Sequence, residues 1–381
     1  MRRLVVVISA IVFLDALLFG ALIPLVPGYV QAFDLSKLQA GLLVGAFGAG
    51  AILGGIPGGI LAGKVGPKNA VVAGLLLLAV ATFGLALAGS PVTVGIARFL
   101  QGISSALTWA GALSWVTVST PRALRGQLLG TVFGIAVLGA ILGPMLGALT
   151  QIAGFRAGFG GIGVVALALA AAALLQPGAP VERVERGALR RAVADPAFVA
   201  GLWLNTLPAL FFGVLDVLAP LALHAGGYGA VAIATVFLAA GLIETALNPL
   251  LGRLSDRRGR LLPIRWALST SIGVGILLAF AEEPLLIAGL AVAAAVSFGG
   301  FYTPGIALVS DRAEFAGLAQ GLAFGVMNTA WAIGALVGPT IGGGLADALG
   351  DAAPYLLCSL LCAVTLATIV RRVRLKRPVT S

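Results

Sequence analysis

Long runs of apolar residues follow one another along almost the whole chain. Twelve of them are long enough to cross a bilayer as a helix, which takes about 20 residues. They fall at 4–27, 39–62, 69–88, 92–118, 127–150, 157–176, 197–223, 229–251, 263–281, 285–308, 318–345 and 353–370. The pattern predicts an all-α membrane protein with twelve transmembrane helices joined by short connections.

The composition supports the same class of protein. Of the 381 residues, 60% are hydrophobic and 10% are charged, whereas soluble domains average about 45–50% apolar and about 25% charged residues. A soluble chain of this size has too little polar surface to cover so many apolar residues. A soluble enzyme, a nucleic-acid-binding domain and a disordered protein are therefore excluded.

The basic residues are distributed unevenly between the two sides of the membrane. If the N-terminus lies inside and the helices alternate, 21 of the 24 lysines and arginines fall on the inner side. Lys37 and Arg156 fall outside, and Arg98 falls within a span. Such a bias is the positive-inside rule. It predicts a multi-pass protein of the inner (cell) membrane with both termini in the cytoplasm, and it assigns the net charge of +10 to topology and anionic lipid rather than to nucleic acid.

The longest polar stretch, 176–196, separates the sixth span from the seventh. It predicts an N-terminal six-helix half at 1–176, a cytoplasmic linker at 177–196 and a C-terminal six-helix half at 197–381. The halves repeat, because residues 139–147 (GAILGPMLG) are echoed by 334–342 (GALVGPTIG). Transporters built from two such halves bind their substrate near the midplane between them.

The loops after the second and eighth spans, 59–66 (GILAGKVG) and 252–259 (GRLSDRRG), also match. They resemble the loop signature of the major facilitator superfamily, and the resemblance extends over essentially the whole chain. The matching residues are Gly59, Lys64 and Gly66 in the first copy, and Gly252, Asp256, Arg257, Gly259 and Arg260 in the second. The resemblance implies that these loops form a gate in which Asp256 accepts hydrogen bonds from a helix N-terminus. The first copy lacks this acid, because Gly63 stands where the family has Asp.

Further motifs are similar to one branch of this family, the drug:proton antiporters. The glycines and proline at Gly139, Gly143, Pro144 and Gly147 look like its antiporter signature, and Arg98 lies in a segment like its fourth-helix motif. The first span resembles that of tetracycline-type efflux proteins and vesicular amine transporters. Two acids of the latter correspond here to Gly299 and Asn328, whereas Asp15 is retained. The resemblance implies proton-coupled export of a small lipophilic or cationic compound by alternating access.

Four ionisable residues lie inside predicted spans: Asp15, Arg98, Asp216 and Glu244. Charges are costly in lipid, so each is a candidate for proton or substrate binding. Asp15 either exchanges a proton or forms a structural pair with Arg98. Asp216 is either a transport acid or a hydrated residue near the outer mouth, and Glu244 either takes part in transport or bonds within its own helix. With one cation and three acids, at least some of the acids must be protonated, hydrated or paired with a bound cation.

Two further residues are candidates for ligand contacts. Trp109 is placed either to stack on a flat or cationic ligand or to pack against neighbouring helices, and Asn328 either binds substrate or ties helices together. One histidine and two cysteines are too few for a metal centre, and no phosphate-binding loop is present. We therefore expect no cofactor and no enzymatic activity.

The expected partners are a small-molecule substrate, protons and the lipid bilayer, without nucleic acid, and the expected state is a monomer. Three alternatives remain. One is a proton-coupled metabolite or sugar importer of the same fold. The others, a membrane enzyme and a lipid scramblase, belong to different classes.

Overall fold

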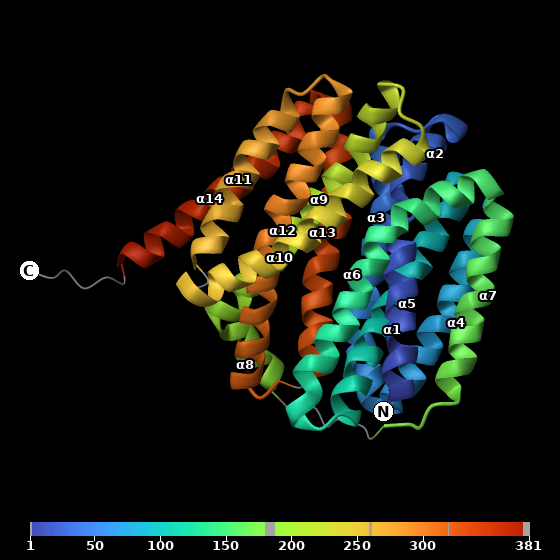
Figure 1. Ribbon diagram of the computed structural model, residues 1–381, viewed down its shortest axis with the longest axis vertical. Coiled ribbons are helices and arrows are strands. Elements are labelled where there is room, and N and C mark those ends of the chain that lie inside the picture. The colour runs from blue at the N-terminus through green and yellow to red at the C-terminus, as the bar shows by residue number, and fades with distance from the viewer. Residues whose placement is uncertain (1, 180–186, 259–260, 319, 376–381) are drawn as a thin grey trace, which may run out of the picture.

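The computed structural model describes residues 2–179, 187–258, 261–318 and 320–375, and all regular elements in these ranges are helices. The first span is α1 (Arg2–Gly20), η1 (Ile23–Leu25) and α2 (Val26–Phe33). The next five are α3 (Lys37–Val65), α4 (Pro67–Ala86), α5 (Pro91–Ser119), α6 (Arg122–Ala153) and α7 (Phe155–Leu174). After the short α8 (Ala188–Ala194) come α9 (Pro196–Ala225), α10 (Ala230–Arg258), α11 (Leu261–Ala279), α12 (Pro284–Phe315), α13 (Gln320–Leu349) and α14 (Ala352–Leu375). The predicted all-α membrane fold is confirmed (Figure 1).

Eleven helical stretches within the described residues, with α1 to α2 counted as one, are long and apolar enough to cross a membrane. The twelfth predicted span is α5, which does not meet this criterion. It carries buried polar residues, among them Arg98, Gln101 and Ser105, which lower its hydropathy. It nevertheless packs inside the bundle against α3 and α4, because its polar residues face other helices rather than lipid.

The first span is interrupted by prolines. Pro24 lies in the first turn of η1 and Pro27 in the first turn of α2, where the missing N–H groups cannot continue the helical hydrogen-bond ladder. The span ends at Asp34, whose backbone is left-handed with φ of 49°. A capping box then begins α3, because Gln39 N–H donates to the Ser36 hydroxyl and Ser36 N–H donates to the Gln39 side chain.

The repeated glycine motif makes the same kind of contact twice. In α6, a Cβ atom added at Gly143 would lie 2.7 Å from the Leu17 carbonyl of α1. In α13, one added at Gly338 would collide with the Leu210 carbonyl of α9. Small residues allow membrane helices to approach this closely. The fifth span of each predicted half therefore packs on the first span of the same half.

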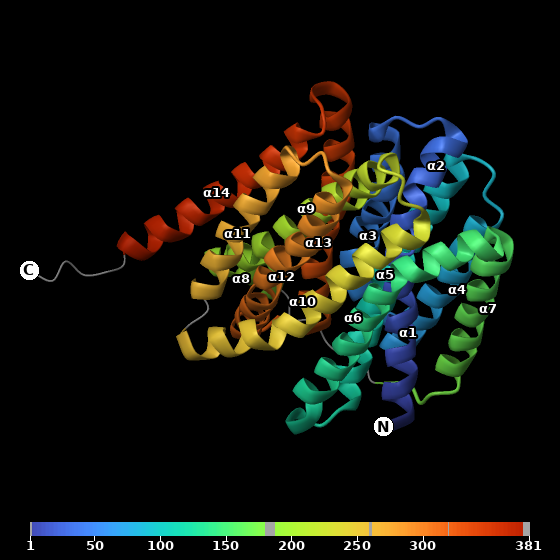
Figure 2. The same ribbon diagram turned by 45° about the horizontal axis from the view of Figure 1, so that its top comes forward.

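The first set of six spans (α1 to α7) and the second set (α9 to α14) meet chiefly along two pairs, α3 with α13 and α6 with α10, and α5 also contacts α13. A Cβ atom added at Gly41 of α3 would collide with Pro339 of α13, and one added at Gly48 would lie 2.6 Å from the Leu336 amide nitrogen. A Cβ atom added at Gly241 of α10 would lie 2.8 Å from the Ile141 side chain of α6. In both ribbon views α6 and α10 cross near the top and separate downward (Figures 1 and 2).

The end of the bundle that holds α8 and the start of α1 is called the linker side here, and the end that holds α2 the far side (Figure 1). Hydrogen bonds join the two sets of helices on the far side. The Gln31 side chain of α2 lies 2.7 Å from the His224 ring of α9. At the start of α3, the N–H groups of Lys37 and Leu38 donate to the carboxylate of Asp347 of α13.

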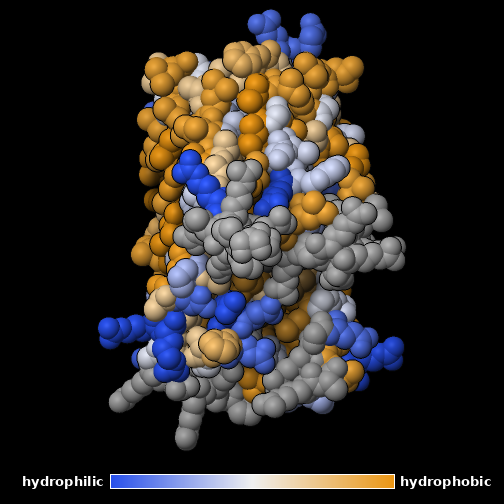
Figure 3. Space-filling model, turned by 90° about the vertical axis from the view of Figure 1, so that its left-hand side faces the viewer, coloured by the Kyte–Doolittle hydropathy of each residue, from blue (hydrophilic) through white to orange (hydrophobic). Residues whose placement is uncertain are grey.

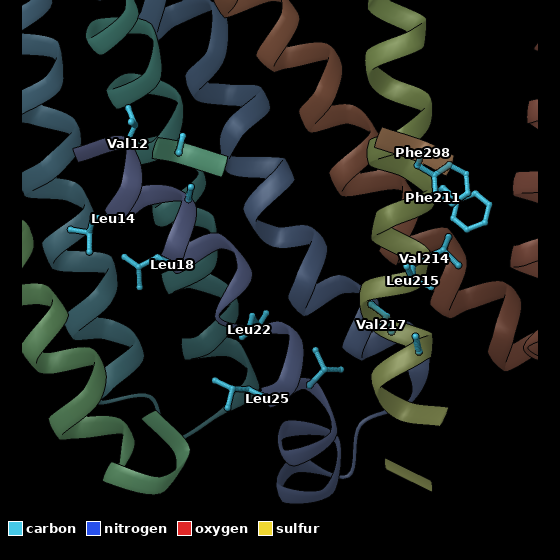
Figure 4. Packing of buried hydrophobic residues seen from close by; sticks show 14 of the residues in the cluster. Val12, Leu14, Leu18, Leu22, Leu25, Phe211, Val214, Leu215, Val217 and Phe298 are labelled. Atoms are coloured by element: carbon cyan, nitrogen blue, oxygen red, sulfur yellow. The ribbon is translucent and has the colours of Figure 1, made fainter. Parts of the chain in front are cut away.

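The surface of the bundle is apolar over much of its height. Exposed hydrophobic residues occur on many helices, and hydrophilic ones gather near the bottom of the face shown, which is the linker side (Figure 3). Inside, Leu14, Leu18 and Leu22 of the first span are buried (Figure 4). Among the last six spans, the rings of Phe211 and Phe298 lie with their centroids 3.7 Å apart (Figure 4). The protein is therefore a multi-pass membrane protein, while its predicted division at 1–176, 177–196 and 197–381 stays a prediction.

Candidate functional site

A cavity of about 650 Å³ lies between the two sets of helices. Residues from α1, α3, α5 and α6 form one wall, and residues from α9, α10, α12 and α13 form the other. Ligand sites for small molecules typically measure about 300–1,000 Å³. The cavity therefore has room for a small organic compound between the two sets.

Aromatic rings line both walls of the cavity. The first set of helices contributes Phe19, Phe47, Trp109 and Phe133. The second contributes Phe212, Phe237, Tyr302, Phe324 and Trp331. Contacts between rings cross from one set to the other, because Phe19 and Phe47 both contact Trp331 edge to face and Phe133 lies 6.1 Å from Phe324 between ring centroids.

Asp15 of α1 lies in the cavity wall and is 2% exposed. Its Oδ2 accepts hydrogen bonds from the Ser105 hydroxyl, at 2.7 Å, and from the Trp109 indole N–H, at 2.8 Å. Both donors lie on α5, one turn apart, so they face α1 together. Its Oδ1 is buried without a hydrogen-bond partner among the described residues. Oδ2 of Asp15 therefore has two donors, whereas Oδ1 has none among the described residues.

Arg98 is fully buried, but it forms no ion pair within 4.0 Å with any described acid. Its guanidinium donates to Gln101 Oε1 at 2.7 Å and lies 5.0 Å from the centre of the Phe47 ring. Of the two alternatives for Asp15, a structural pair with Arg98 is thus not made by direct contact in this structure. Ser105 and Trp109 lie closer to Asp15 along α5 and provide its hydrogen bonds instead.

Asp216 of α9 and Glu244 of α10 both line the opposite wall. Asp216 is 9% exposed and Glu244 is partly buried. Among the described residues, neither carboxylate has a hydrogen-bond or ion-pair partner. Asp216 faces the cavity rather than bulk solvent at an outer mouth, and Glu244 does not bond within its own helix as one alternative expected.

The remaining predicted ligand contacts also line the cavity. Trp109 is both a wall residue and the donor to Asp15, and Asn328 of α13 lies on the opposite wall. Sequence reasoning missed Ser105 and Tyr302, which line the cavity as well. The position of Ser105, seven residues after Arg98 and four before Trp109 on one helix, is the signal that was available for the first of them.

The antiporter-like residues Gly139, Gly143, Pro144 and Gly147 pack against the first span, with Gly147 next to Ala21 and Pro24, and Pro144 also lines the cavity. In the first gate-loop copy, Gly59 is buried in α3, Lys64 is exposed in its last turn, and Gly66 has φ of 90° between α3 and α4. In the second copy, residues 252–258 belong to α10, but their side chains lie outside what the structure describes. The side chains of Asp256 and Arg257 and the position of Gly252 in its surroundings are not defined, and Gly259 and Arg260 fall between the described ranges.

The cavity wall contains no basic residue among the described residues that line it. Within the described part of the chain, no group of three or more His, Cys, Asp or Glu side chains could hold a metal ion. The described residues that line the cavity thus provide three carboxylates, two amides (Asn205 and Asn328), hydroxyls and aromatic rings.

Comparison with known proteins agrees with this architecture. A model of the Major Facilitator Superfamily matches residues 8–324, so the chain belongs to this superfamily. Membership in this superfamily places the chain among membrane transporters rather than enzymes. This confirms the family on which the sequence motifs converged.

Individual relatives match parts of the chain. The MFS-type transporter ppzB of Metarhizium rileyi is 31% identical over 35% of this chain and 29% of its own length. The quinolone resistance protein NorA of Staphylococcus aureus is 27% identical over 46% of each chain. The matched stretches thus span about a third to a half of these curated relatives.

Solved structures share the fold over nearly the whole chain. A bacterial homologue of the human lysosomal transporter Spinster, in an inward-facing and occupied conformation, has a TM-score of 0.75 at 17% identity and covers 97% of this chain and 96% of its own. A D-xylose-proton symporter has a TM-score of 0.72 at 17% identity and covers 94% of this chain and 96% of its own. At these identities the likeness concerns the fold alone.

Proposed function

We propose that this transporter exports a small lipophilic or cationic compound from the cytoplasm in exchange for protons. The observation that carries the proposal is the cavity, in which Asp15, Asp216 and Glu244 face a largely aromatic lining with no basic residue among its described members. Such a lining favours a positively charged or protonatable organic compound over an anion. The partial match to the quinolone resistance protein NorA supports export over import.

The transport cycle uses Asp15 as the proton-exchanging group. Its carboxylate already has two donors and one free oxygen, so it accepts a proton without losing its contacts to α5. Protonation from outside displaces the substrate cation, and release of the proton inside restores the site. The halves then rock about the midplane cavity between inward-facing and outward-facing states.

In this cycle the linker side is the cytoplasmic side and the structure represents an inward-facing state. The hydrogen bonds of Gln31 with His224 and of Asp347 with α3 join the two sets of helices on the far side. The separation of α6 from α10 toward the linker side supports the same assignment (Figure 2). In this state Asp15 lies in the wall of the cavity between the two sets.

The test uses the full chain reconstituted into liposomes with an imposed pH gradient. A fluorescent organic cation should accumulate against its own gradient in the direction opposite to the proton flow, and it should not accumulate when an ionophore removes the pH gradient. Accumulation in the same direction as the protons would instead establish the importer alternative. Absence of gradient-driven movement for both cationic and neutral compounds would overturn proton coupling.

The orientation is tested separately by cysteine labelling in intact cells. A cysteine at Gly187 in the linker should resist a membrane-impermeant reagent, whereas one at Gly226 at the far-side end of α9 should react. Equal labelling of both positions would contradict the placement of the linker side in the cytoplasm.

A further inference from the structure

Of the three acids that line the cavity, Glu244 is the one on α10, which packs against α12. Its carboxylate is packed directly against Gly299 of α12. If residue 299 carried a Cβ atom, this atom would collide with Oε1 and lie 2.7 Å from Cδ and 2.8 Å from Cγ of Glu244. The glycine therefore provides the space in which the acid of the neighbouring helix rests.

The described α12 residues that line the cavity include no acid, and this contact places the Glu244 carboxylate against their helix. Gly299 and Tyr302, three residues later on the same helix, both line the cavity, as does Glu244. The side chain of Glu244 thus reaches from α10 across the α12 surface into the cavity. The acid and the glycine work as one unit that spans two helices.

The charge of this unit is not balanced by the protein. Neither Glu244 nor Asp216 has a hydrogen-bond or ion-pair partner among the described residues, and Asp216 is nine-tenths buried while it faces the cavity. A carboxylate removed from bulk water without a partner is unfavourable. The last six spans therefore present two unpaired carboxylates to any ligand that enters.

The surroundings fit a cation. Aromatic residues Phe212, Phe237 and Tyr302 line the same wall, and the faces of such rings attract positive charge. The buried Arg98 is not among the residues that line the cavity. Asp15, in contrast, already receives two hydrogen bonds from α5, which leaves it less available to a ligand than the acids opposite.

We propose that Glu244, seated over Gly299, binds the positive charge of an organic cation with an aromatic body, together with Asp216, while Asp15 exchanges the proton. The inference rests on the proposed function in so far as this cavity carries the transported compound. Binding of the cation then belongs to the second set of helices and exchange of the proton to the first.

The experiment measures binding of tetraphenylphosphonium, a permanent cation without an exchangeable proton, to the full chain in neutral detergent at fixed pH and salt. Glu244→Gln should weaken binding by about tenfold or more, the loss typical of a desolvated charge contact. Glu282→Gln is the matched control, because it removes the same charge from an exposed residue outside the cavity. Triphenylphosphine oxide, a neutral probe with similar rings, should bind with nearly equal affinity to all three proteins.

Two variants test the seat of the carboxylate. Gly299→Ala keeps the acid but forces the flexible end of Glu244 to move, so tetraphenylphosphonium binding should weaken although the charge is unchanged. Glu244→Ala combined with Gly299→Asp moves the carboxylate onto α12 at nearly the same place. The affinity for tetraphenylphosphonium should then recover to within about threefold of the parent protein, whereas Glu244→Gln alone loses about tenfold, which corresponds to 1.4 kcal/mol. Thermal unfolding of each variant shows that it is folded.

Several results would overturn the inference. They are unchanged cation affinity in Glu244→Gln, equal losses for the cationic and neutral probes, or no recovery in a folded protein with the relocated acid. Failure of the proposed function is a different result. In that case, acid-dependent cation binding persists, but a pH gradient drives no uphill movement in liposomes.

Discussion

Gly20 and Gly213 occupy matching places in the two sets of six helices. A Cβ atom added at Gly20 of α1 would lie 3.2 Å from the Pro144 ring of α6, and one added at Gly213 of α9 would collide with the Pro339 ring of α13. Helix packing is therefore repeated almost residue for residue. The Gly-Pro motif has the same structural use in both sets.

The charged residues of the two sets do not repeat. Asp15 in the first set receives hydrogen bonds from Ser105 and Trp109, whereas Asp216 and Glu244 in the second set have no partner among the described residues. Positions between helices are constrained by close approach, but positions facing a cavity are not. The comparison shows that one packing scheme supports two different chemistries, which we assign to proton exchange and cation recognition.

The largest effect is expected from Asp15→Asn. Asparagine can still accept hydrogen bonds from Ser105 and Trp109 through its carbonyl oxygen, so the fold is retained, but it cannot release a proton. Export driven by a pH gradient should fall to the level of protein-free liposomes, while binding of a neutral probe persists. The measurement is uptake into liposomes together with proton release on ligand addition in weak buffer.

Asp34→Asn is the control for this variant, because Asp34 is an exposed acid in a left-handed turn that asparagine tolerates. It should transport like the parent protein. Wild-type proton release from Asp15→Asn would transfer the coupling role to Asp216 and would break the proposed division between the two sets.

An intermediate effect is expected when the repeated packing is disturbed. Gly143→Ala and Gly338→Ala each push a methyl group into the backbone of the neighbouring helix, and overpacking of this kind costs about 1–3 kcal/mol. Both variants should unfold at lower temperature by a similar amount when they are heated in the same detergent. Transport per folded molecule should change in parallel for the two.

Matched controls exist on exposed helix faces. A Cβ atom added at Gly134 of α6 or at Gly289 of α12 meets nothing within 4 Å, so Gly134→Ala and Gly289→Ala should leave the unfolding temperature unchanged or raise it. A loss of stability at Gly143 without one at Gly338 would show that the two packing contacts are not equivalent.

The smallest effect is expected at the far-side contact between the sets. Asp347→Asn removes the negative charge that accepts hydrogen bonds from the N-terminus of α3. Such a contact is worth about 0.3–1 kcal/mol when exposed, which corresponds to a two- to fivefold change in an equilibrium. Spin labels at Ala32 and Ala225 should therefore report a modest increase in the population with a longer far-side distance.

Asp351→Asn provides the comparison for this contact. Asp351 forms an exposed ion pair with Lys37 at 2.5 Å, and exposed pairs contribute little. Its effect on the distance distribution should be smaller than that of Asp347→Asn. The reverse order would show that the ion pair, rather than the helix terminus, holds the far side closed.

The spans were predictable because each is a local property of the chain. Residues that can cross a bilayer are apolar over about 20 positions, and prolines and capping residues mark where a helix can begin. α5 was also predicted as a span, from the apolar stretch at 92–118, although its polar residues lower its hydropathy. The low hydropathy of α5 comes from polar residues, and one of them, Ser105, donates a hydrogen bond to Asp15 in the site.

The candidate acids were also predictable, because a carboxylate inside an apolar run is conspicuous in the sequence. Their partners were not. One alternative paired Asp15 with Arg98, the basic residue that lies within a predicted span, but rotation and crossing of α1 and α5 bring Ser105 and Trp109 to Asp15. The placement of Glu244 against Gly299 depends in the same way on how α10 crosses α12.

The sequence by itself determined the membrane class, the helical spans, the family and the four charges within the spans, because these follow from local hydropathy and from motifs read along the chain. Only the tertiary structure decided which charges face one cavity, which have donors and which have none. These properties depend on contacts between residues such as Asp15 and Trp109 that lie far apart in the chain. Hydropathy is a local property of the chain and does not report such contacts. They depend on how the helices cross, which the glycines at the points of closest approach determine.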